Sequence, residues 1–228
     1  ALVRAKVAIL RLAQPGMDMA SQQAARDEYR SYMALAGQCT GPQRPAVIIT
    51  HGLSGSGKSW YATRLAEQLG AIRIRSDVER KRLFGYAADA DTGSGLQSGI
   101  YTAAASTRTY EHMAGLAQHV LEAAYPVIID AAFLKRGERD RFRQLAANLG
   151  VPFMMLVCNA PEDPLRQLIL MRQAADTDPS EAGIAVLETQ LQSREPPGAD
   201  ERDDSITLEP VDVEPIAAVA DWIAGRMK

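Results

Sequence analysis

One segment of the sequence reads Gly52-Leu53-Ser54-Gly55-Ser56-Gly57-Lys58-Ser59. It fills every fixed position of the phosphate-binding P-loop, G-x-x-x-x-G-K-[ST]. The glycines permit positive backbone φ angles and bring backbone N–H groups close to phosphate oxygens. Lys58 would place a positive charge on the β- and γ-phosphates, and Ser59 would offer a hydroxyl to Mg²⁺. The motif therefore predicts a site for ATP and Mg²⁺. Its expected nucleotide ligands are Gly52, Ser54, Gly55, Ser56, Gly57, Lys58 and Ser59.

The residues on both sides of the P-loop support this interpretation. Residues 46–51 form an apolar, partly β-branched run that is typical of a buried parallel strand. Residues 59–69 carry leucines four positions apart, as in a helix, and Gly70 is a suitable helix end. A flexible linker that carried Lys-Ser by chance would lack this context. Trp60, directly after the motif, either packs against a neighbouring helix or stacks on adenine.

Length and composition fit a globular protein of one or two domains. The chain has 228 residues, of which 46% are hydrophobic and 23% charged. A net charge of −3 and a pI of about 5.7 provide no overall basic field of the kind that attracts nucleic acid. Cys39 and Cys158 have no metal-binding or redox spacing and indicate reduced thiols in a cytoplasmic protein. No apolar run approaches the roughly 20 residues of a membrane span, and no signal peptide is visible.

Residues 1–45 have a different character from the rest of the chain. Pro15-Gly16 separates two expected helices, and Asp18 is placed to cap the second. Glycines and prolines from residue 37 to 45 predict a linker. Because the sequence also begins without Met, we expect this part to be the tail of a preceding domain. The two expected helices are Leu2–Leu12 and Met17–Ala36.

Strands and helices are expected to alternate through residues 46–228. The expected strands are 46–51, 71–75, 126–130, 152–158 and 205–209. The expected helices are 58–69, 77–84, 98–124, 137–149, 161–175, 180–193 and 212–226. This alternation predicts an α/β domain with a parallel sheet, helices on both faces and right-handed crossovers.

Asp77 follows the second expected strand, where ligands bind in open α/β sheets. A carboxylate there would accept the proton of an acceptor hydroxyl during phosphoryl transfer. Arg80, three residues further along, would share a helix face with it and hold an anionic or polar acceptor. The alternative is that Asp77 only caps the helix. The two interpretations are compatible.

Asp130 ends the third expected strand, after Val127-Ile128-Ile129. An acid after an apolar strand, downstream of a P-loop, matches the position of the Walker B carboxylate. It would bind Mg²⁺ through water or orient Ser59. An ordinary turn residue is the alternative, and the need of the P-loop for a metal partner favours the functional interpretation.

Arginines later in the chain are candidates for contact with the phosphoryl group and the acceptor. Phosphoryl transfer needs positive charge on the equatorial oxygens, often from a mobile lid, which we expect at about residues 161–183. Arg166 and Arg172 are the lid candidates, with Arg194 beyond them. Most of the basic run from 135 to 143 should form a solvated helix face, and one member should reach the acceptor pocket. That member is expected to be Arg136 or Arg139.

Taken together, these residues resemble the P-loop kinases that include polynucleotide kinase, zeta-toxin-type kinases and gluconate kinase. The shared features are the P-loop, the Asp-x-x-Arg of Asp77 and Arg80, the strand-end Asp130 and an arginine-bearing lid. The resemblance implies that Asp77 is the general base, that Arg80 contacts the acceptor, and that Arg136 or Arg139 lies close to the substrate. The fold it implies is a P-loop NTPase three-layer sandwich. We expect five parallel strands in the order 2-3-1-4-5 and a helical lid.

A closer resemblance covers about residues 46–197. The strings HGLSGSGKS, IRSDVERKRLFG, YPVIIDAAFL and SREP are similar to the C-terminal domain of bifunctional aminoglycoside-phosphotransferase-like/P-loop ATP-binding proteins. In that family an aminoglycoside-phosphotransferase-like domain comes first, and residues 1–40 would be its last helices. Ala132 departs from the pattern, because relatives often carry Thr there, which leaves the exact role of Asp130 open. The name of the preceding domain does not make this chain a resistance enzyme.

The sequence thus predicts a cytoplasmic kinase that uses ATP and Mg²⁺ to phosphorylate a hydroxyl of a small molecule. A polynucleotide 5′-kinase would need a basic groove, which the acidic pI disfavours, although arginines cluster between residues 73 and 82. A module that senses ATP and regulates a fused domain is a second alternative, and a simple NTPase is a third. No readable code names the acceptor. Tyr86, Tyr101, Arg108 and Tyr110 either line its pocket or serve packing.

Overall fold

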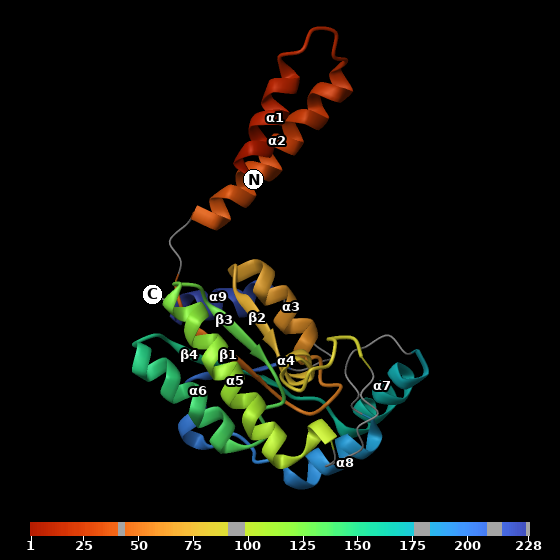
Figure 1. The fold of residues 1–228 in the computed structure, drawn as a ribbon, viewed down its shortest axis with the longest axis vertical. Helices are drawn as coiled ribbons and strands as arrows, with labels where there is room; N and C mark the ends of the chain where they lie inside the picture. The colour runs from red at the N-terminus through yellow and green to blue at the C-terminus, as the bar shows by residue number, and fades with distance from the viewer. Residues whose placement is uncertain (41–43, 91–98, 176–182, 209–215, 227–228) are drawn as a thin grey trace. The chain divides into compact units, whose positions relative to one another are not determined.

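The strand that leads into the P-loop lies at the centre of the sheet. In the computed structural model, β1 (Val47–His51) is buried along its whole length and lies between β3 (Val127–Asp130) and β4 (Phe153–Cys158) (Figure 1). The outer strands are β2 (Ile72–Arg75) and β5 (Ser205–Leu208). All pairs are parallel, and the order β2-β3-β1-β4-β5 confirms the prediction. Central strands covered on both faces need largely apolar side chains, and β1 and β3 each begin with Val-Ile-Ile.

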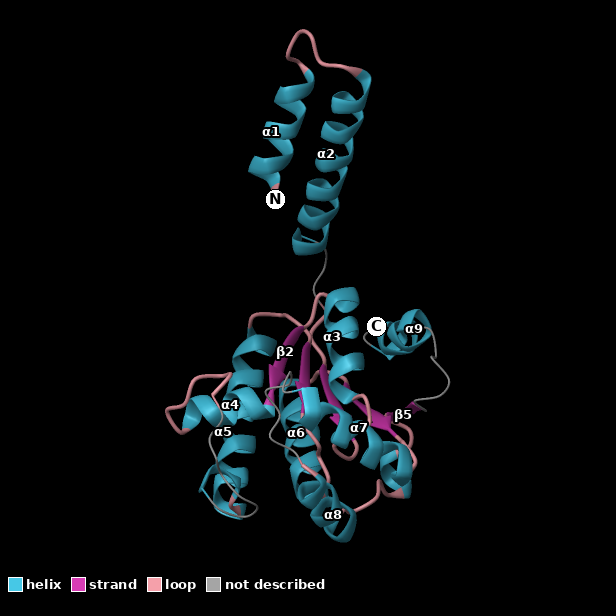
Figure 2. Ribbon diagram, turned by 90° about the vertical axis from the view of Figure 1, so that its right-hand side faces the viewer, coloured by secondary structure: helices cyan, strands magenta, loops and turns pink. Residues whose placement is uncertain are grey.

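Helices cover both faces of the sheet and make the three layers expected from the sequence (Figure 2). On one face α3 (Lys58–Leu69) and α9 (Ile216–Arg226) pack against Ile48. On the other face α5 (Ala103–Glu122) and α6 (Arg136–Leu149) pack against the side chains that alternate with it. The second core includes Val47, Ile49, Met113, Ile129, Phe133, Phe142 and Met155, all fully or nearly fully buried. Burial of this much apolar surface is the main driving force for the fold.

A third, smaller core joins the predicted lid region to the P-loop. Its helices are α7 (Glu162–Ala175) and α8 (Ile184–Ser193). Leu165 of α7 and Leu187 of α8 are fully buried together with Leu53 of the P-loop. The described helices of this region therefore contact the loop that they are expected to cover.

The starts of two helices, α5 and α4 (Ser76–Leu83), differ from the predicted positions. The helix expected from residue 98 begins as a 3-10 turn, Gly99–Tyr101, and α5 starts only after Thr102, whose hydroxyl accepts a hydrogen bond from Ala105 N. α4 starts one residue early. A second 3-10 turn, Ala199–Glu201, was not predicted.

Residues 1–43 form a separate unit from Arg44–Lys228. Two helices make it up, α1 (Leu2–Leu12) and α2 (Met19–Thr40). Asp18 accepts a hydrogen bond from Ser21 N at 2.6 Å, so the predicted cap is confirmed. The linker expected from residue 37 was placed too early, because α2 continues through Gly37 to Thr40. The structure describes residues 1–40, 44–90, 99–175, 183–208 and 216–226. Within these ranges, no helix is both long and apolar enough to cross a membrane.

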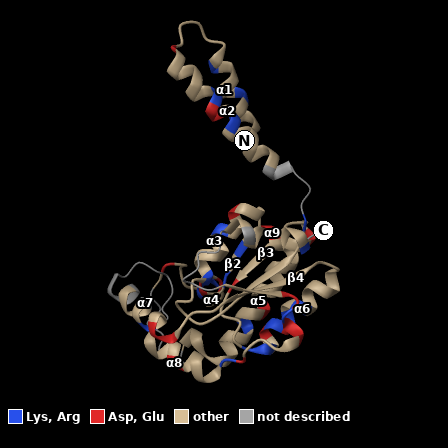
Figure 3. Ribbon diagram, turned by 180° about the vertical axis from the view of Figure 1, so that it is seen from behind, with Lys and Arg blue, Asp and Glu red and all other residues tan. Residues whose placement is uncertain are grey.

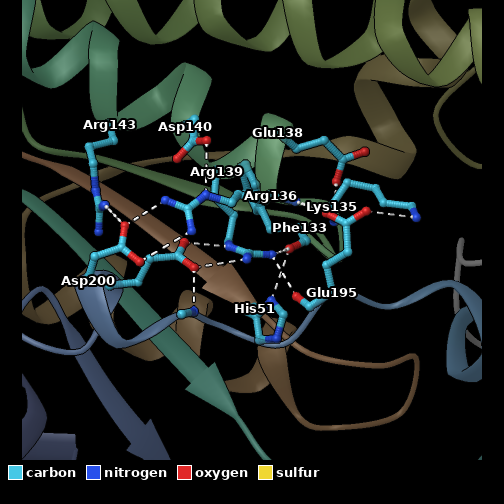
Figure 4. A network of polar contacts seen from close by, with 12 residues as sticks. His51, Phe133, Lys135, Arg136, Glu138, Arg139, Asp140, Arg143, Glu195 and Asp200 are labelled. Carbon is cyan, nitrogen blue, oxygen red and sulfur yellow. Dashed lines mark hydrogen bonds and ion pairs between the residues drawn. The ribbon is translucent and has the colours of Figure 1, made fainter.

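A buried ion pair fixes the segment that follows α8 to the end of β3. Arg139 is 1% exposed and donates to both carboxylate oxygens of Glu201, at 2.7 and 3.0 Å (Figure 4). Its remaining nitrogen donates to the carbonyl oxygens of Phe133 and Glu195, at 3.1 and 3.0 Å. Nδ1 of the buried His51 also lies 2.9 Å from the Phe133 oxygen. The network therefore joins the end of β1, the end of β3, α6 and the turn at residue 201.

Burial and hydrogen bonding have opposite effects on the carboxylate of this pair. Burial raises the pKa of Glu201, but hydrogen bonds from Arg139 and from Gly198 N hold that pKa below its usual range. Burial also lowers the pKa of His51, so its ring is neutral at pH 7. Arg139 is thus the main charge in this network, and Glu201 is its neutralising partner.

Replacing Glu201 by Gln should destabilise the domain strongly. The substitution keeps the volume but leaves the Arg139 charge buried without its carboxylate, which costs about 3–5 kcal/mol. Glu111→Gln is the matched control, because it removes a carboxylate that pairs with Arg141 across a largely exposed surface at 3.4 Å. Urea unfolding should show a large decrease in the free energy of unfolding for Glu201→Gln and no measurable change for Glu111→Gln. Equal stability of the two variants would mean that the buried pair is not holding the fold.

Candidate active site: the P-loop and the strand ends beside it

The P-loop packs closely against the end of β4 on one side and against α7 on the other. Gly52 has φ +150°, and a Cβ there would lie 2.5 Å from the carbonyl oxygen of Cys158 at the end of β4. On the other side, a Cβ at Gly55 would lie 3.3 Å from the Leu165 side chain of α7. Gly57, with φ +85°, is the N-cap of α3. Only glycine fits the first of these positions, because the backbone of β4 cannot move aside.

The interior of the loop offers polar groups for phosphate. Oγ of Ser56 is buried and has no hydrogen-bond partner among the described residues. Lys58 Nζ donates to the Leu53 carbonyl at 2.6 Å, which keeps the ammonium inside the loop. The N-terminus of α3 points its N–H groups at the same region. An unpartnered hydroxyl, a cation and a helix N-terminus suit a triphosphate, so the residues present fit the nucleotide that the motif predicts.

A small cavity continues from the loop toward β4. Its volume is about 50 Å³, and it is lined by both apolar and polar side chains. Arg194 is part of this lining and also lies 3.9 Å from a carboxylate oxygen of Glu162. The cavity belongs to the nucleotide site because P-loop residues form one wall. Its lining residues are His51, Gly52, Leu53, Ser56, Leu134, Val157, Cys158, Asn159, Ala160, Leu165 and Arg194.

Ser59 and Asp130 meet as expected for a metal site. The Ser59 hydroxyl donates to Oδ2 of Asp130 at 2.8 Å, and Asp130 is 5% exposed. Among the described residues, no group of three or more His, Cys, Asp or Glu side chains is arranged to hold a metal. Mg²⁺ usually keeps several waters and takes other ligands from phosphate. The chain would supply the hydroxyl of Ser59 directly and the carboxylate of Asp130 through water.

Asp77 lies in the first turn of α4 and is held by a neighbouring arginine. Arg75 donates to both of its carboxylate oxygens, at 3.2 and 2.5 Å. The N-cap of α4 is Arg75, so the alternative that Asp77 caps this helix is wrong. In the sheet register Arg75 lies opposite Asp130. The carboxylates of Asp77 and Asp130 therefore follow adjacent strands at the same edge of the sheet.

Arg80 is buried behind this edge. It donates to the Ile100 carbonyl at 3.0 Å and to Ser106 Oγ at 3.2 Å, and its guanidinium carbon lies 5.3 Å from the centre of the Tyr101 ring. Burial lowers its pKa, although an arginine stays charged. These contacts place Arg80 between α4 and the start of α5, next to Tyr101.

The two arginines expected to approach the acceptor lie in other contacts. Arg136 is exposed and pairs with Asp200 at 2.6 Å and with Asp140 at 3.4 Å. Arg139 has its donors engaged inside the protein, as described above. The structure therefore gives Arg139 a role in positioning the segment after α8, and its side chain is buried at 1% exposure.

In the lid region, Arg166 is surrounded by acids. It pairs with Glu188 of α8 at 2.9 Å and also with Asp163 and Glu162 of its own helix, at 3.3 and 3.6 Å. The side chain of Arg172 and residues 176–182, which complete the predicted lid, lie outside the described part of the chain. The approach of either arginine to phosphate stays a prediction.

Trp60 is 39% exposed at the start of α3. The guanidinium of Arg64 covers its ring at 3.9 Å, and Tyr61 meets it edge-on at 4.9 Å. Both contacts lie within α3, and packing against a neighbouring helix stays a prediction. Adenine stacking stays a prediction.

Two polar contacts of the site were not predicted. Gln190 of α8 accepts a hydrogen bond from Ser54 N at 2.8 Å, which connects α8 directly to the P-loop. Arg73 of β2 donates to Oδ2 of Asp130 at 3.1 Å through Nε and forms a closer ion pair through Nη2. The one available signal was the Ile-Arg-Ile-Arg alternation of residues 72–75, which puts both arginines on one face of β2.

Comparison with known families agrees with this geometry. The model of a family described as an AAA domain matches residues 47–197. The chain belongs to this AAA-domain family. The matched range runs from the start of β1 to the segment after α8 and so includes the P-loop, Asp77, Asp130 and Arg194.

The curated relatives are longer proteins. An uncharacterized protein of Mycobacterium tuberculosis (strain H37Rv) and another of Mycobacterium bovis are each 29% identical over 178 residues, which is 78% of this chain and 34% of theirs. The chain thus spans about a third of the length of the curated relatives it matches.

Solved structures of Kti12 and of two kinases share the fold. Kti12 of Chaetomium thermophilum, in complex with ADP-AlF3, is 19% identical with a TM-score of 0.63, covering 80% of this chain and 99% of that one. The Mycobacterium tuberculosis APS kinase CysC, in complex with AMPPNP and APS, is 19% identical with a TM-score of 0.57, covering 82% and 99%. A gluconokinase from Sinorhizobium meliloti is 22% identical with a TM-score of 0.52, covering 81% and 93%. The domain therefore has the nucleotide-binding P-loop fold of such kinases.

Replacing Gly52 by Ala should weaken nucleotide binding. The new methyl group would collide with the Cys158 carbonyl and with Ser56 Oγ, 2.7 Å away, and would displace the loop. Loss of one hydrogen bond to a charged phosphate costs about 1.5–3 kcal/mol. ADP affinity should therefore fall by roughly ten- to a hundredfold, which calorimetric titration can measure. Gly70→Ala is the matched control, since Gly70 also has a positive φ but has open space around it, at the far end of α3. Equal ADP affinity of both variants would contradict the importance of the close approach.

Proposed function

We propose that this domain transfers the γ-phosphoryl group of ATP to a hydroxyl of a small molecule, with Mg²⁺ bound at Ser59 and Asp130. One observation carries the proposal. Two carboxylates follow adjacent strands beside the P-loop, and only Asp130 is engaged with the P-loop hydroxyl. The side chain of Asp77 is 22% exposed and pairs with Arg75, and we assign it a second task at the acceptor. A simple binding site has no need of this second carboxylate, whereas phosphoryl transfer uses a residue that orients or deprotonates the nucleophile.

The residues of the chain divide the chemistry between them. The P-loop binds the triphosphate, and Lys58 neutralises charge on the β- and γ-phosphates. Asp77 takes the proton of the acceptor hydroxyl as the oxygen–phosphorus bond forms and ADP leaves. Arg80 orients the acceptor. Arg166, Arg172 and Arg194 approach when the region around residues 161–183 closes, which excludes water and favours transfer over hydrolysis.

Several features support a small acceptor. Arg73 and Arg75, part of the basic cluster that a polynucleotide kinase would use, are paired with Asp130 and Asp77. The net charge of −3 also disfavours a nucleic-acid partner. Two proteins of the same fold are named as kinases of small molecules, gluconokinase and APS kinase. We further propose a cytoplasmic location, where ATP is abundant, and a preceding aminoglycoside-phosphotransferase-like domain in the longer protein.

A nucleotide-sensing module is the second candidate. The observation that favours it is the two-pronged contact of Arg75 with Asp77, which occupies the proposed base. A sensor would bind ATP tightly, show negligible transfer to any acceptor and lose nothing when Asp77 is changed.

Replacing Asp77 by Asn should remove most of the turnover and spare ATP binding. An amide keeps the shape but cannot take a proton, and general-base catalysis typically contributes about 10²–10⁴-fold. ATP consumption is measured against sugars, sugar nucleotides, aminoglycosides, nucleosides and oligonucleotide 5′ ends. Lys58→Ala, which should abolish transfer, is the background control. Unchanged turnover in the Asp77→Asn protein would refute the general-base role, and binding without turnover in wild type would favour the sensor.

A further inference from the structure

Asp130, the carboxylate proposed to bind Mg²⁺ through water, already forms an ion pair with Arg73. Besides the Nε bond at 3.1 Å and the closer Nη2 contact, Arg73 donates through Nη1 to Thr63 Oγ1 of α3 at 2.6 Å. The Arg73 side chain is 18% exposed, and that of Asp130 is 4% exposed. Figure 3 shows β2, which carries this arginine, beside α3. The guanidinium therefore lies between the edge strand, the metal carboxylate and the helix that follows the P-loop.

The donors that reach Asp130 converge on a single oxygen. Ser59, the expected metal ligand, and Arg73 both donate to Oδ2 of Asp130. Waters that join a metal to Asp130 would also donate to this carboxylate, so the metal and the arginine share the negative charge of one group. A dication next to the guanidinium adds electrostatic repulsion, which is strong where solvent is largely excluded.

We propose that Arg73 is an internal counter-ion that competes with Mg²⁺ for Asp130 and thereby sets the Mg²⁺ affinity of the nucleotide complex. Without metal, it neutralises a buried carboxylate and holds it against Ser59. When Mg²⁺ arrives with the nucleotide, the guanidinium withdraws from Asp130 and keeps its contact with Thr63. The inference rests on the proposed function only in requiring a complex of Mg²⁺ and nucleotide at this site, and it needs no phosphoryl transfer.

A merely structural ion pair makes the opposite prediction. If Arg73 only held Asp130 in position for the metal, then removing it would weaken Mg²⁺ binding or leave it unchanged. Competition predicts tighter Mg²⁺ binding. The sign of the change in Mg²⁺ affinity therefore separates the two roles.

Arg75→Met provides a matched control. Arg75 is two residues further along the same strand, has a similar partly buried side chain and also pairs with an aspartate, Asp77. Its removal changes the charge near the site by the same amount without freeing Asp130. A general effect of the electric field would appear in both variants, whereas competition for Asp130 would appear only at Arg73.

The experiment measures ADP binding by calorimetry in EDTA and across a series of Mg²⁺ concentrations. In the Arg73→Met protein the Mg²⁺ concentration for half-maximal enhancement of ADP binding should fall by about tenfold, within the usual range of coupling between sites. Arg75→Met should leave it within about twofold of wild type. Arg73→Gln keeps hydrogen-bond donors but removes the charge, so it should behave like Arg73→Met. It replaces Arg73→Met in the experiment if the Met variant does not fold.

Three results would overturn the inference. An unchanged or higher Mg²⁺ requirement in both Arg73 variants would show a structural pair, and an equal fall in Arg75→Met would show a field effect. If Mg²⁺ does not enhance ADP binding by the wild-type protein, the metal site at Ser59 and Asp130 is wrong, and the inference is wrong with it. The proposed function fails separately if the wild-type protein does not bind ADP at all.

Discussion

The close approach of Gly52 to the Cys158 carbonyl is the constraint on which the site depends. It exists because β1 and β4 are parallel neighbours that end together, so the chain leaving β1 must turn directly over the end of β4. Leu165 of α7 then covers the loop at Gly55. The backbone of the P-loop is thus positioned by contacts with β4 and α7, and its N–H groups need little rearrangement to bind phosphate. Such preorganisation is what makes backbone amides effective at charged sites.

Charge around the P-loop is balanced by short-range pairs. Among the described residues, Arg73 pairs with Asp130, Arg75 with Asp77 and Arg166 with Glu188. Each pair offsets part of the cost of desolvating its cation. A bound nucleotide would replace carboxylates as the partner of some of these cations. Affinity at the site would then reflect an exchange of partners, which is smaller than the full attraction between an arginine and a phosphate.

The sequence predicted those parts of the site whose chemistry is local. The P-loop, the strand before it and the helix after it lie within residues 47–69, and the carboxylate at the end of β3 follows directly from its apolar strand. The strand order was also predicted, through the resemblance to P-loop kinases. The partners of the arginines could not be predicted, because Glu201 lies 62 residues from Arg139 and Asp130 lies 57 from Arg73. An arginine-rich helix is normally a solvated face, and only the fold shows that one of its members is buried.

The central claim is that the γ-phosphoryl group of ATP moves to a hydroxyl and not to water. The most direct measurement is ³¹P NMR of ATP incubated with Mg²⁺, the protein and a small-molecule cell extract. The account predicts that the γ-phosphate signal is replaced by a phosphomonoester signal in proportion to the ADP formed, and that the extract is required. Formation of inorganic phosphate in its place, or ADP formation that does not depend on the extract, would contradict it.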